Sequence, residues 1–148
     1  MKEETGAIRP VPRIFVVDDE HVIASTLAAI LNMNGFSARF FTQPREALHA
    51  AQSDVPDLLL SDVTMPGLSG IDLAIQVRAL CPRCKILLFS GQAAAVDLLV
   101  DARSQGHDFD LLLKPVHPTV LLSTIRKPRD ERPGAVEDLR ECVDEGPE

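Results

Sequence analysis

Acidic residues end two apolar segments that lie far apart in the chain. Asp18 and Asp19 follow the run 14–17, and Asp62 follows the run 58–61. If both runs are buried strands, these terminal carboxylates lose hydration, and a cation or hydrogen bonds must offset that cost. The carboxylates also repel one another, because at about 4 Å and an effective dielectric constant near 20 each pair costs on the order of 4 kcal/mol. We therefore interpret the three acids as part of a metal site.

The chemistry of this acidic cluster favours magnesium. Its ligands are hard oxygens with no clustered His or Cys, and such sets bind Mg²⁺, or Mn²⁺ in its place, in preference to zinc. Mg²⁺ usually keeps waters and shares its shell with a phosphate. Ser90 and Lys114 follow two later apolar runs, and these residue types can donate to phosphoryl oxygens and neutralise their charge. Phosphoryl transfer needs little beyond positioning and charge neutralisation, so the set suits that chemistry.

Short apolar runs separated by helix-length segments predict the elements that position these side chains. The predicted strands are 13–17, 37–41, 57–61, 85–89 and 109–113, and the predicted helices are 20–33, 43–51, 69–80, 92–104 and 118–126. Strands that alternate with helices form a parallel sheet with helices on both faces. We expect a doubly wound five-stranded α/β sheet of order 2-1-3-4-5, which binds ligands beyond the carboxyl ends of strands 1 and 3. The acidic cluster ends those two strands.

Local signals refine these elements. Gly35 is expected to close the first helix in a left-handed conformation. Thr42 is the candidate cap of the second helix, with Pro44 in its first turn, and Pro118 lies near the start of the fifth. Arg39 lies within the second apolar run, which predicts an edge strand there because inner strands of a parallel sheet are apolar throughout.

The composition fits one domain. The chain has 148 residues, of which 45% are apolar, and this is enough for a single buried core. We expect a loose segment at 1–12, the domain at 13–126 and an acidic, flexible tail at 127–148. The tail holds eight acids against four basic residues, so −4 of the formal charge of −7 lies there. A short partner-binding or self-packing helix, with the stripe Val136, Leu139 and Val143, is the alternative for the tail.

Charge and hydropathy also exclude some function classes. No stretch approaches the roughly 18 to 20 uncharged apolar residues that a membrane helix needs, and the first residues lack the apolar segment of a signal peptide. We therefore expect a cytoplasmic protein with no membrane partner. The formal charge of −7 argues against a nucleic-acid partner, because affinity for phosphate backbones comes from clustered Lys and Arg.

The order of these residues resembles the receiver domain of bacterial two-component response regulators, over about residues 12 to 126. The resemblance rests on Asp18-Asp19, on Asp62 with the turn 65–70, on Ser90 and on Lys114-Pro115. It implies a flavodoxin-like (βα)5 fold and a stand-alone phosphoacceptor rather than an enzyme acting on other molecules. It also implies a sensor histidine kinase or phosphotransfer protein as donor, and an unknown downstream protein that contacts helix 4, strand 5 and helix 5.

The resemblance further implies a role for each site residue. Asp62 would attack a phosphohistidine and form an acyl phosphate. Asp19, the Asp62 carboxylate and the Thr64 carbonyl would bind Mg²⁺ directly, and Asp18 would act largely through water. Lys114 would contact the phosphoryl oxygens and precede a cis peptide bond. Ser90 would bond to the phosphoryl group and draw the following loop inward.

One position departs from the family pattern. Receivers commonly carry Tyr or Phe three residues before the strand 5 Lys, and this chain has Leu111 there. Phe109 lies two residues earlier and, by strand alternation, points to the same face. Our hypothesis is that any signal is carried by the loop 90–92 and the helix after it, without an aromatic rotamer switch.

Other interpretations of the chemistry remain open. A receiver-like docking module that works without phosphorylation has the same fold. An aspartate-nucleophile phosphatase of the haloacid dehalogenase type also uses Asp, Lys and Mg²⁺. Such enzymes carry an Asp-x-Asp motif after the first strand, whereas here residue 64 is Thr and the proposed nucleophile follows the third strand. Cys81 and Cys84 have the spacing of a redox or zinc half-site, and a helix-to-strand connection with two reduced thiols is the simpler interpretation. His21 lies beside the acidic cluster and is expected at a solvated helix position.

Overall fold

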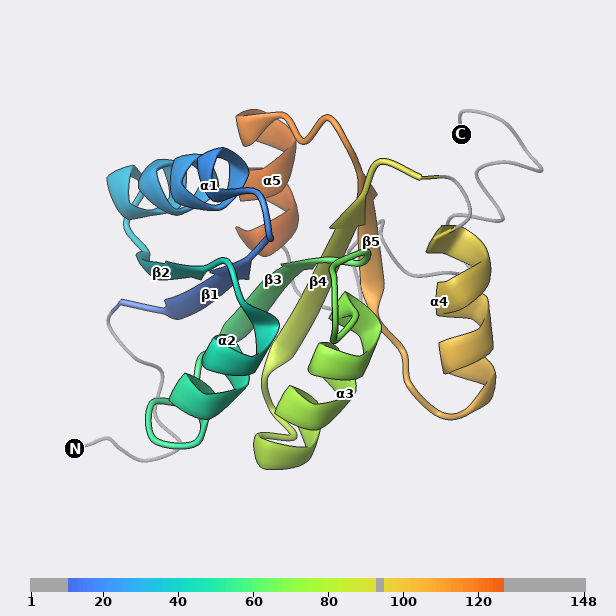
Figure 1. Ribbon diagram of the computed structural model, residues 1–148. Coiled ribbons are helices and arrows are strands. Elements are labelled where there is room, and N and C mark those ends of the chain that lie inside the picture. Colours follow the sequence, from blue (N-terminus) through green and yellow to red (C-terminus); the bar gives the residue numbers. More distant parts are fainter. Residues whose placement is uncertain (1–10, 93–94, 127–148) are drawn as a thin grey trace.

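The chain forms a three-layer α/β fold, and its computed structural model describes residues 11–92 and 95–126 (Figure 1). The strands are β1 (Arg13–Val17), β2 (Ser37–Phe41), β3 (Leu58–Asp62), β4 (Lys85–Ser90) and β5 (Asp110–Leu113). The helices are α1 (His21–Met33), α2 (Pro44–Ala51), α3 (Gly70–Leu80), α4 (Ala95–Ser104) and α5 (Pro118–Arg126). All ten elements lie within about three residues of their predicted positions. The largest difference is α4, whose described part begins at Ala95.

The strands form one parallel sheet in the order β2-β1-β3-β4-β5, as predicted. Val17 pairs with Ser61 in the register of β1 and β3, so the residues that follow these two strands emerge side by side. Helices α1 and α5 cover one face of the sheet, and α2 and α3 cover the other (Figure 1). The carboxyl-end rim of β1 and β3 is therefore the place where distant acidic residues meet.

Burial separates the central strands from the edge strand. Every residue of β3 is buried, whereas most of β2 is exposed or half-buried. The prediction that 37–41 is an edge strand is confirmed. The Arg39 guanidinium lies 5.6 Å from the ring centre of Phe15 and 5.0 Å from that of Phe41. It therefore covers both rings on one side and stays in contact with water on the other.

The helix ends test the local signals. Gly35 follows α1 with φ +95°, in the left-handed region, which confirms its predicted role. Pro44 is the first residue of α2, as expected, but Gln43 occupies the capping position and its side chain makes no capping hydrogen bond. The prediction that Thr42 caps this helix is wrong, because Thr42 lies one residue too early. Ser69 caps α3 by accepting a hydrogen bond from the Asp72 amide at 3.1 Å.

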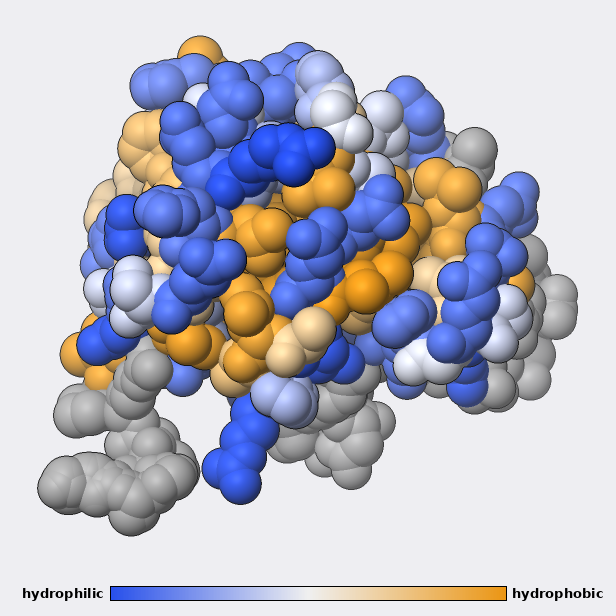
Figure 2. Space-filling view, turned by 60° about the horizontal axis from the view of Figure 1, so that its bottom comes forward, coloured by the Kyte–Doolittle hydropathy of each residue, from blue (hydrophilic) through white to orange (hydrophobic). Residues whose placement is uncertain are grey.

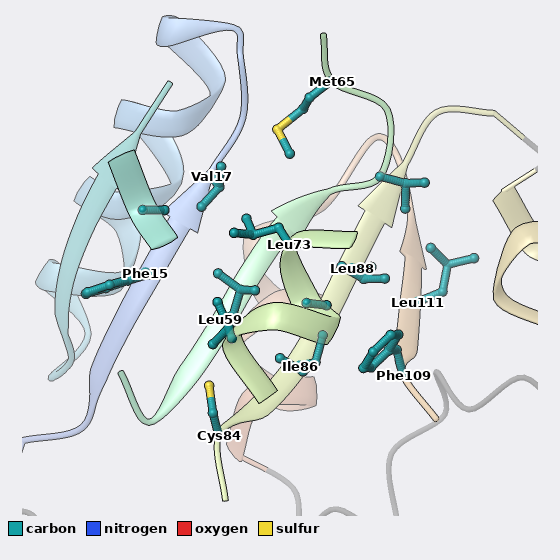
Figure 3. Packing of buried hydrophobic residues seen from close by; sticks show 14 of the residues in the cluster. Phe15, Val17, Leu59, Met65, Leu73, Cys84, Ile86, Leu88, Phe109 and Leu111 are labelled. Carbon is teal, nitrogen blue, oxygen red and sulfur yellow. The ribbon is translucent and has the colours of Figure 1, made fainter. Parts of the chain in front are cut away.

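Two apolar clusters, one on each face of the sheet, form the core. The larger combines residues of the sheet with residues of α2, α3 and α4, and part of it is drawn in Figure 3. Phe109 and Leu111 both belong to this cluster and are 1% and 2% exposed, which confirms that they share a face. Hydrophilic residues cover much of the surface in Figure 2, with apolar residues showing between them. No helix among the described residues is long and apolar enough to cross a membrane.

Cys81 and Cys84 lie in the turn between α3 and β4, and both are free thiols. The Cys84 amide donates to the Cys81 carbonyl at 3.0 Å, and burial raises the pKa of the Cys84 thiol to about 12. A thiol with so high a pKa is a poor nucleophile. The prediction that these residues connect a helix to a strand is confirmed.

The predicted terminal segments fall largely outside this description. Residues 1–10 and 127–148 are outside the described residues, so the expected loose N-terminal segment and acidic tail stay predictions. Within the described part, the Pro12 carbonyl accepts a hydrogen bond from the Ser37 amide at 2.9 Å.

Candidate functional site

Asp62 is the last residue of β3, and the backbone of the next residue, Val63, is held by two hydrogen bonds. The Val63 amide donates to the Phe89 carbonyl at 3.0 Å, so the strand pairing continues past Asp62. The Gly70 amide donates to the Val63 carbonyl at 2.8 Å, which ties the start of α3 to the end of β3. Asp62 is 7% exposed overall. Its carboxylate therefore sits in a nearly closed site on a rigid strand end.

Asp18 and Asp19 reach the same place from the end of β1. Asp18 is fully buried; its Oδ1 accepts from the Glu20 amide at 2.8 Å. Asp19 is exposed. One carboxylate oxygen from each of Asp18, Asp19 and Asp62 lies within 4.8 Å of the other two. The structure thus brings together the three acids that the sequence singled out.

Lys114 extends over these acids from the end of β5. Its amide donates to the Ser90 carbonyl at 2.8 Å, which aligns the ends of β4 and β5. Its Nζ lies 3.3 Å from Asp18 Oδ2 and 3.6 Å from Asp62 Oδ2. The Lys114–Pro115 peptide bond is cis, as the resemblance implied.

Ser90 and Thr64 occupy the rim around the acids. Ser90 ends β4 and is 1% exposed, and its Oγ accepts from the Gln92 amide at 3.0 Å. That bond uses a lone pair of the hydroxyl oxygen, and the hydroxyl proton stays available to donate. Thr64 supplies a backbone hydrogen bond that lowers the pKa of Asp62.

The electrostatics of the site leave negative charge uncompensated. The pKa of Asp62 is raised above 3.8, chiefly by burial and further by the charges of Asp18 and Asp19, against the lowering effect of Lys114. Three carboxylates face one ammonium here. A divalent cation balances that charge, and an all-oxygen donor set with its atoms this close fits Mg²⁺ or Mn²⁺. The acids that the sequence analysis assigned to a metal site are therefore suited to one.

We predict that Asp62→Asn stabilises the folded protein at neutral pH when no divalent ion is present. The folded-state pKa of Asp62 is raised, so its ionised form weakens folding, and this unfavourable contribution is lost as the pH falls through the raised pKa. The variant should gain on the order of 1 kcal/mol at neutral pH, with the gain shrinking toward acid pH. Urea unfolding across this range measures the difference.

The control for this prediction is Asp101→Asn on the exposed surface of α4, which should change the free energy of unfolding by less than about 0.5 kcal/mol. Mg²⁺ should raise the stability of the wild type more than that of Asp62→Asn. A destabilised Asp62→Asn at neutral pH would contradict the proposed charge imbalance.

Gly70 is a site residue to which the sequence analysis assigned no role. A Cβ at this position would lie 1.9 Å from the carbonyl oxygen of Asp62 and 2.8 Å from its carbonyl carbon. Only glycine lets α3 begin this close to the backbone of Asp62. The signal in the sequence is a second glycine, three residues after Gly67, in the segment that follows Asp62.

We predict that Gly70→Ala costs about 1 to 3 kcal/mol or more of folding free energy, because the backbone of β3 or α3 must move to admit the methyl group. Gly91→Ala is the matched control, since its Cβ would meet Lys114 side-chain carbons at 3.8 Å, an ordinary contact. The free energy of unfolding in urea compares the two. Equal losses in both variants would show that the Gly70 contact does not limit the packing.

Comparison with known proteins gives a consistent result. The family model for the response regulator receiver domain matches residues 14–126. The transcriptional regulatory protein CreB of Escherichia coli is 31% identical over 113 residues, which are 76% of this chain and 48% of CreB. The chain therefore spans about half the length of that relative.

Solved structures show the same likeness. The chemotaxis protein CheY4 of Vibrio cholerae superposes with a TM-score of 0.71 at 26% identity, covering 78% of this chain and 97% of CheY4. A response regulator receiver protein from Pseudomonas putida gives a TM-score of 0.69 at 30% identity, covering 82% of this chain and 100% of the other.

Proposed function

This chain belongs to the response regulator receiver domain family, and on that premise we propose that Asp62 accepts a phosphoryl group from a histidine-phosphorylated donor in a Mg²⁺-dependent reaction. One observation carries the proposal. Oxygens of three carboxylates lie within 4.8 Å of one another, and the Lys114 ammonium lies 3.3 Å from Asp18 and 3.6 Å from Asp62. An acidic cluster with two buried members, Asp18 and Asp62, and one ammonium beside it suits a phosphoryl group more than a structural role.

The proposed step is one displacement at phosphorus. An oxygen of the Asp62 carboxylate attacks the phosphorus of the phosphohistidine in a sensor kinase or phosphotransfer protein. The P–O bond of an acyl phosphate forms while the P–N bond breaks, and the imidazole leaves with the electron pair and takes up a proton. Lys114 neutralises charge on the phosphoryl oxygens, and the Ser90 hydroxyl donates to one of them in the product.

Asp18, Asp19, Asp62 and the Thr64 carbonyl are the groups that would hold the metal ion. When bound, Mg²⁺ supplies positive charge that offsets the repulsion between the carboxylates and the incoming phosphoryl group. The rest of the task falls to the protein, because β1 and β3 fix the acids and β5 delivers Lys114. The closed setting of Asp62 keeps bulk water from its carboxylate.

The test is phosphoryl uptake by the purified protein. Incubation with acetyl phosphate and Mg²⁺ should raise the intact mass by one phosphoryl group, and a chelator should prevent the gain. A second small donor, phosphoramidate, guards against poor recognition of acetyl phosphate. No gain with either donor would favour the phosphorylation-independent docking module. Steady hydrolysis of a small phosphate ester would instead revive the phosphatase alternative.

We also propose that the output is a change in the protein surface offered by α4, β5 and α5. Leu98, Leu113 and Val120 lie on these three elements and are 51%, 51% and 47% exposed, and exposed apolar side chains of this kind suit a protein contact. The sequence-based exclusion of nucleic acid is not supported by the relatives, since CreB is named a transcriptional regulatory protein. Stand-alone signalling by this chain is part of the proposal.

The readout is expected to work without an aromatic rotamer switch, because Leu111 and Phe109 are both buried in the core. We predict that a beryllofluoride phosphoryl mimic changes amide chemical shifts in the loop 90–92 and along α4, because Ser90 reaches toward the bound group. The ring of Phe109, which packs under the Arg78 guanidinium at 5.5 Å, should keep its shifts. Unchanged amides from 90 to 105 would contradict the prediction.

A further inference from the structure

The Lys114 ammonium has a third neighbour besides the two carboxylates. Its Nζ lies 5.1 Å from the centre of the Phe89 ring, within the range of a cation–π interaction. Phe89 has no exposed area, and the Lys114 side chain is only 24% exposed. Such contacts are worth more where water is excluded. The ammonium therefore rests between two negative groups and the negative face of an aromatic ring.

Phe89 is a rigid support for this contact. It lies in the middle of the sheet, where it pairs with Asp62 on β3 and with Leu112 on β5. Its side chain packs in the apolar cluster under α1 and α5 with Val16 and Leu60. Because Phe89 and Asp62 are paired across β4 and β3, the sheet sets where the ring starts relative to the Asp62 carboxylate.

Lys114 is held weakly by the carboxylates alone. Its distances of 3.3 and 3.6 Å to Asp18 and Asp62 exceed the roughly 2.7–2.9 Å of a strong charge-assisted hydrogen bond. A lysine side chain has a flexible four-carbon stem and carries much rotamer entropy. Beside it lies a pocket of about 630 Å³ lined mainly by apolar residues, including Phe89, Pro115 and Val116, so the side chain is not packed tightly on that side. An additional contact is needed to fix one position.

We propose that Phe89 is a positioning residue that holds the Lys114 ammonium between Asp18 and Asp62, ready for the incoming phosphoryl group. This inference rests on the proposed function and adds a specific role for a core residue. The competing explanation is that Phe89 fills space and nothing more. The two differ in what happens when the ring keeps its shape but loses the negative charge on its face.

Site-specific replacement of Phe89 by mono-, di- and trifluorinated phenylalanine makes that change. Each fluorine weakens the negative face while the ring stays close to its original size. The rate of phosphoryl uptake from acetyl phosphate at fixed Mg²⁺ should fall step by step, by about two- to thirty-fold in total. The same series at Phe36, whose ring lies under Arg126 at 5.7 Å, should leave the rate unchanged. A flat series at Phe89 would overturn the proposal.

A double-mutant cycle gives an independent test. Phe89→Leu keeps an apolar side chain and removes the ring, and it should slow uptake by about two- to thirty-fold in the wild type. In a Lys114→Met background the same replacement should have little further effect, because no ammonium remains to be positioned. An equal slowing in both backgrounds would show that Phe89 acts through packing alone.

A spectroscopic readout separates this inference from the proposed function. The side-chain methylene protons of Lys114 next to Nζ should show an upfield ring-current shift in the wild type, which Phe89→Leu removes. If the wild type takes up no phosphoryl group, the proposed function fails, and these shifts still decide whether the ring holds the ammonium. If uptake occurs and the shifts match those of an unstructured lysine, the positioning role fails. The fluorinated series covers the case in which Phe89→Leu does not fold.

Discussion

Asp62→Asn is expected to abolish phosphoryl uptake completely while the protein stays folded. The amide is close in size to the carboxylate, but its oxygen carries no full negative charge and is a poor nucleophile toward phosphorus. Asp18 is not expected to replace it, because it is fully buried with its oxygens engaged by Glu20 and Lys114. Intact mass after incubation with acetyl phosphate and Mg²⁺ measures the effect.

Two further variants sharpen this experiment. Asp101→Asn makes the same chemical change on the exposed surface of α4 and should retain uptake in full. Asp19→Asn removes a proposed metal ligand and should retain uptake only at raised Mg²⁺ concentration, since the ion would lose one of its oxygens. A phosphoryl group on Asp62→Asn would mean that another residue is the acceptor.

Lys114→Met is expected to slow phosphoryl uptake by about 10²- to 10³-fold, the usual cost of removing one group that stabilises transition-state charge. Methionine keeps a long flexible side chain and loses the ammonium that lies 3.3 and 3.6 Å from the carboxylates of Asp18 and Asp62. Since Lys114 lowers the pKa of Asp62, its loss also raises that pKa further.

The rate can be followed by intact mass over time, because the chain contains no tryptophan to report on the site by fluorescence. Lys85→Met is the matched control. Lys85 begins β4 at the opposite end of that strand from Ser90 and is exposed, so its loss should leave the rate unchanged. A wild-type rate in Lys114→Met would remove this residue from the proposed mechanism.

Much of the fold followed from the sequence because strands and helices are encoded locally. Buried parallel strands read as continuous apolar runs, and β3 and β4 are buried over nearly their whole length. Gly35 signalled the end of α1 through its backbone freedom. The prediction at Thr42 was wrong, because a capping residue is defined by where the helix backbone begins, and a shift of one residue removes the contact.

The sequence by itself determined which residue types end which strands, and hence that Asp18, Asp19, Asp62, Ser90 and Lys114 share one rim of the sheet. Only the tertiary structure decided how their side chains meet. Lys114 is 96 positions from Asp18, and their contact depends on the register of β1, β3, β4 and β5 together. The closeness of Gly70 to the Asp62 carbonyl and the ring of Phe89 beside the Lys114 ammonium have the same origin. Local patterns specify strands, whereas distances between side chains on different strands are set by how the whole sheet packs.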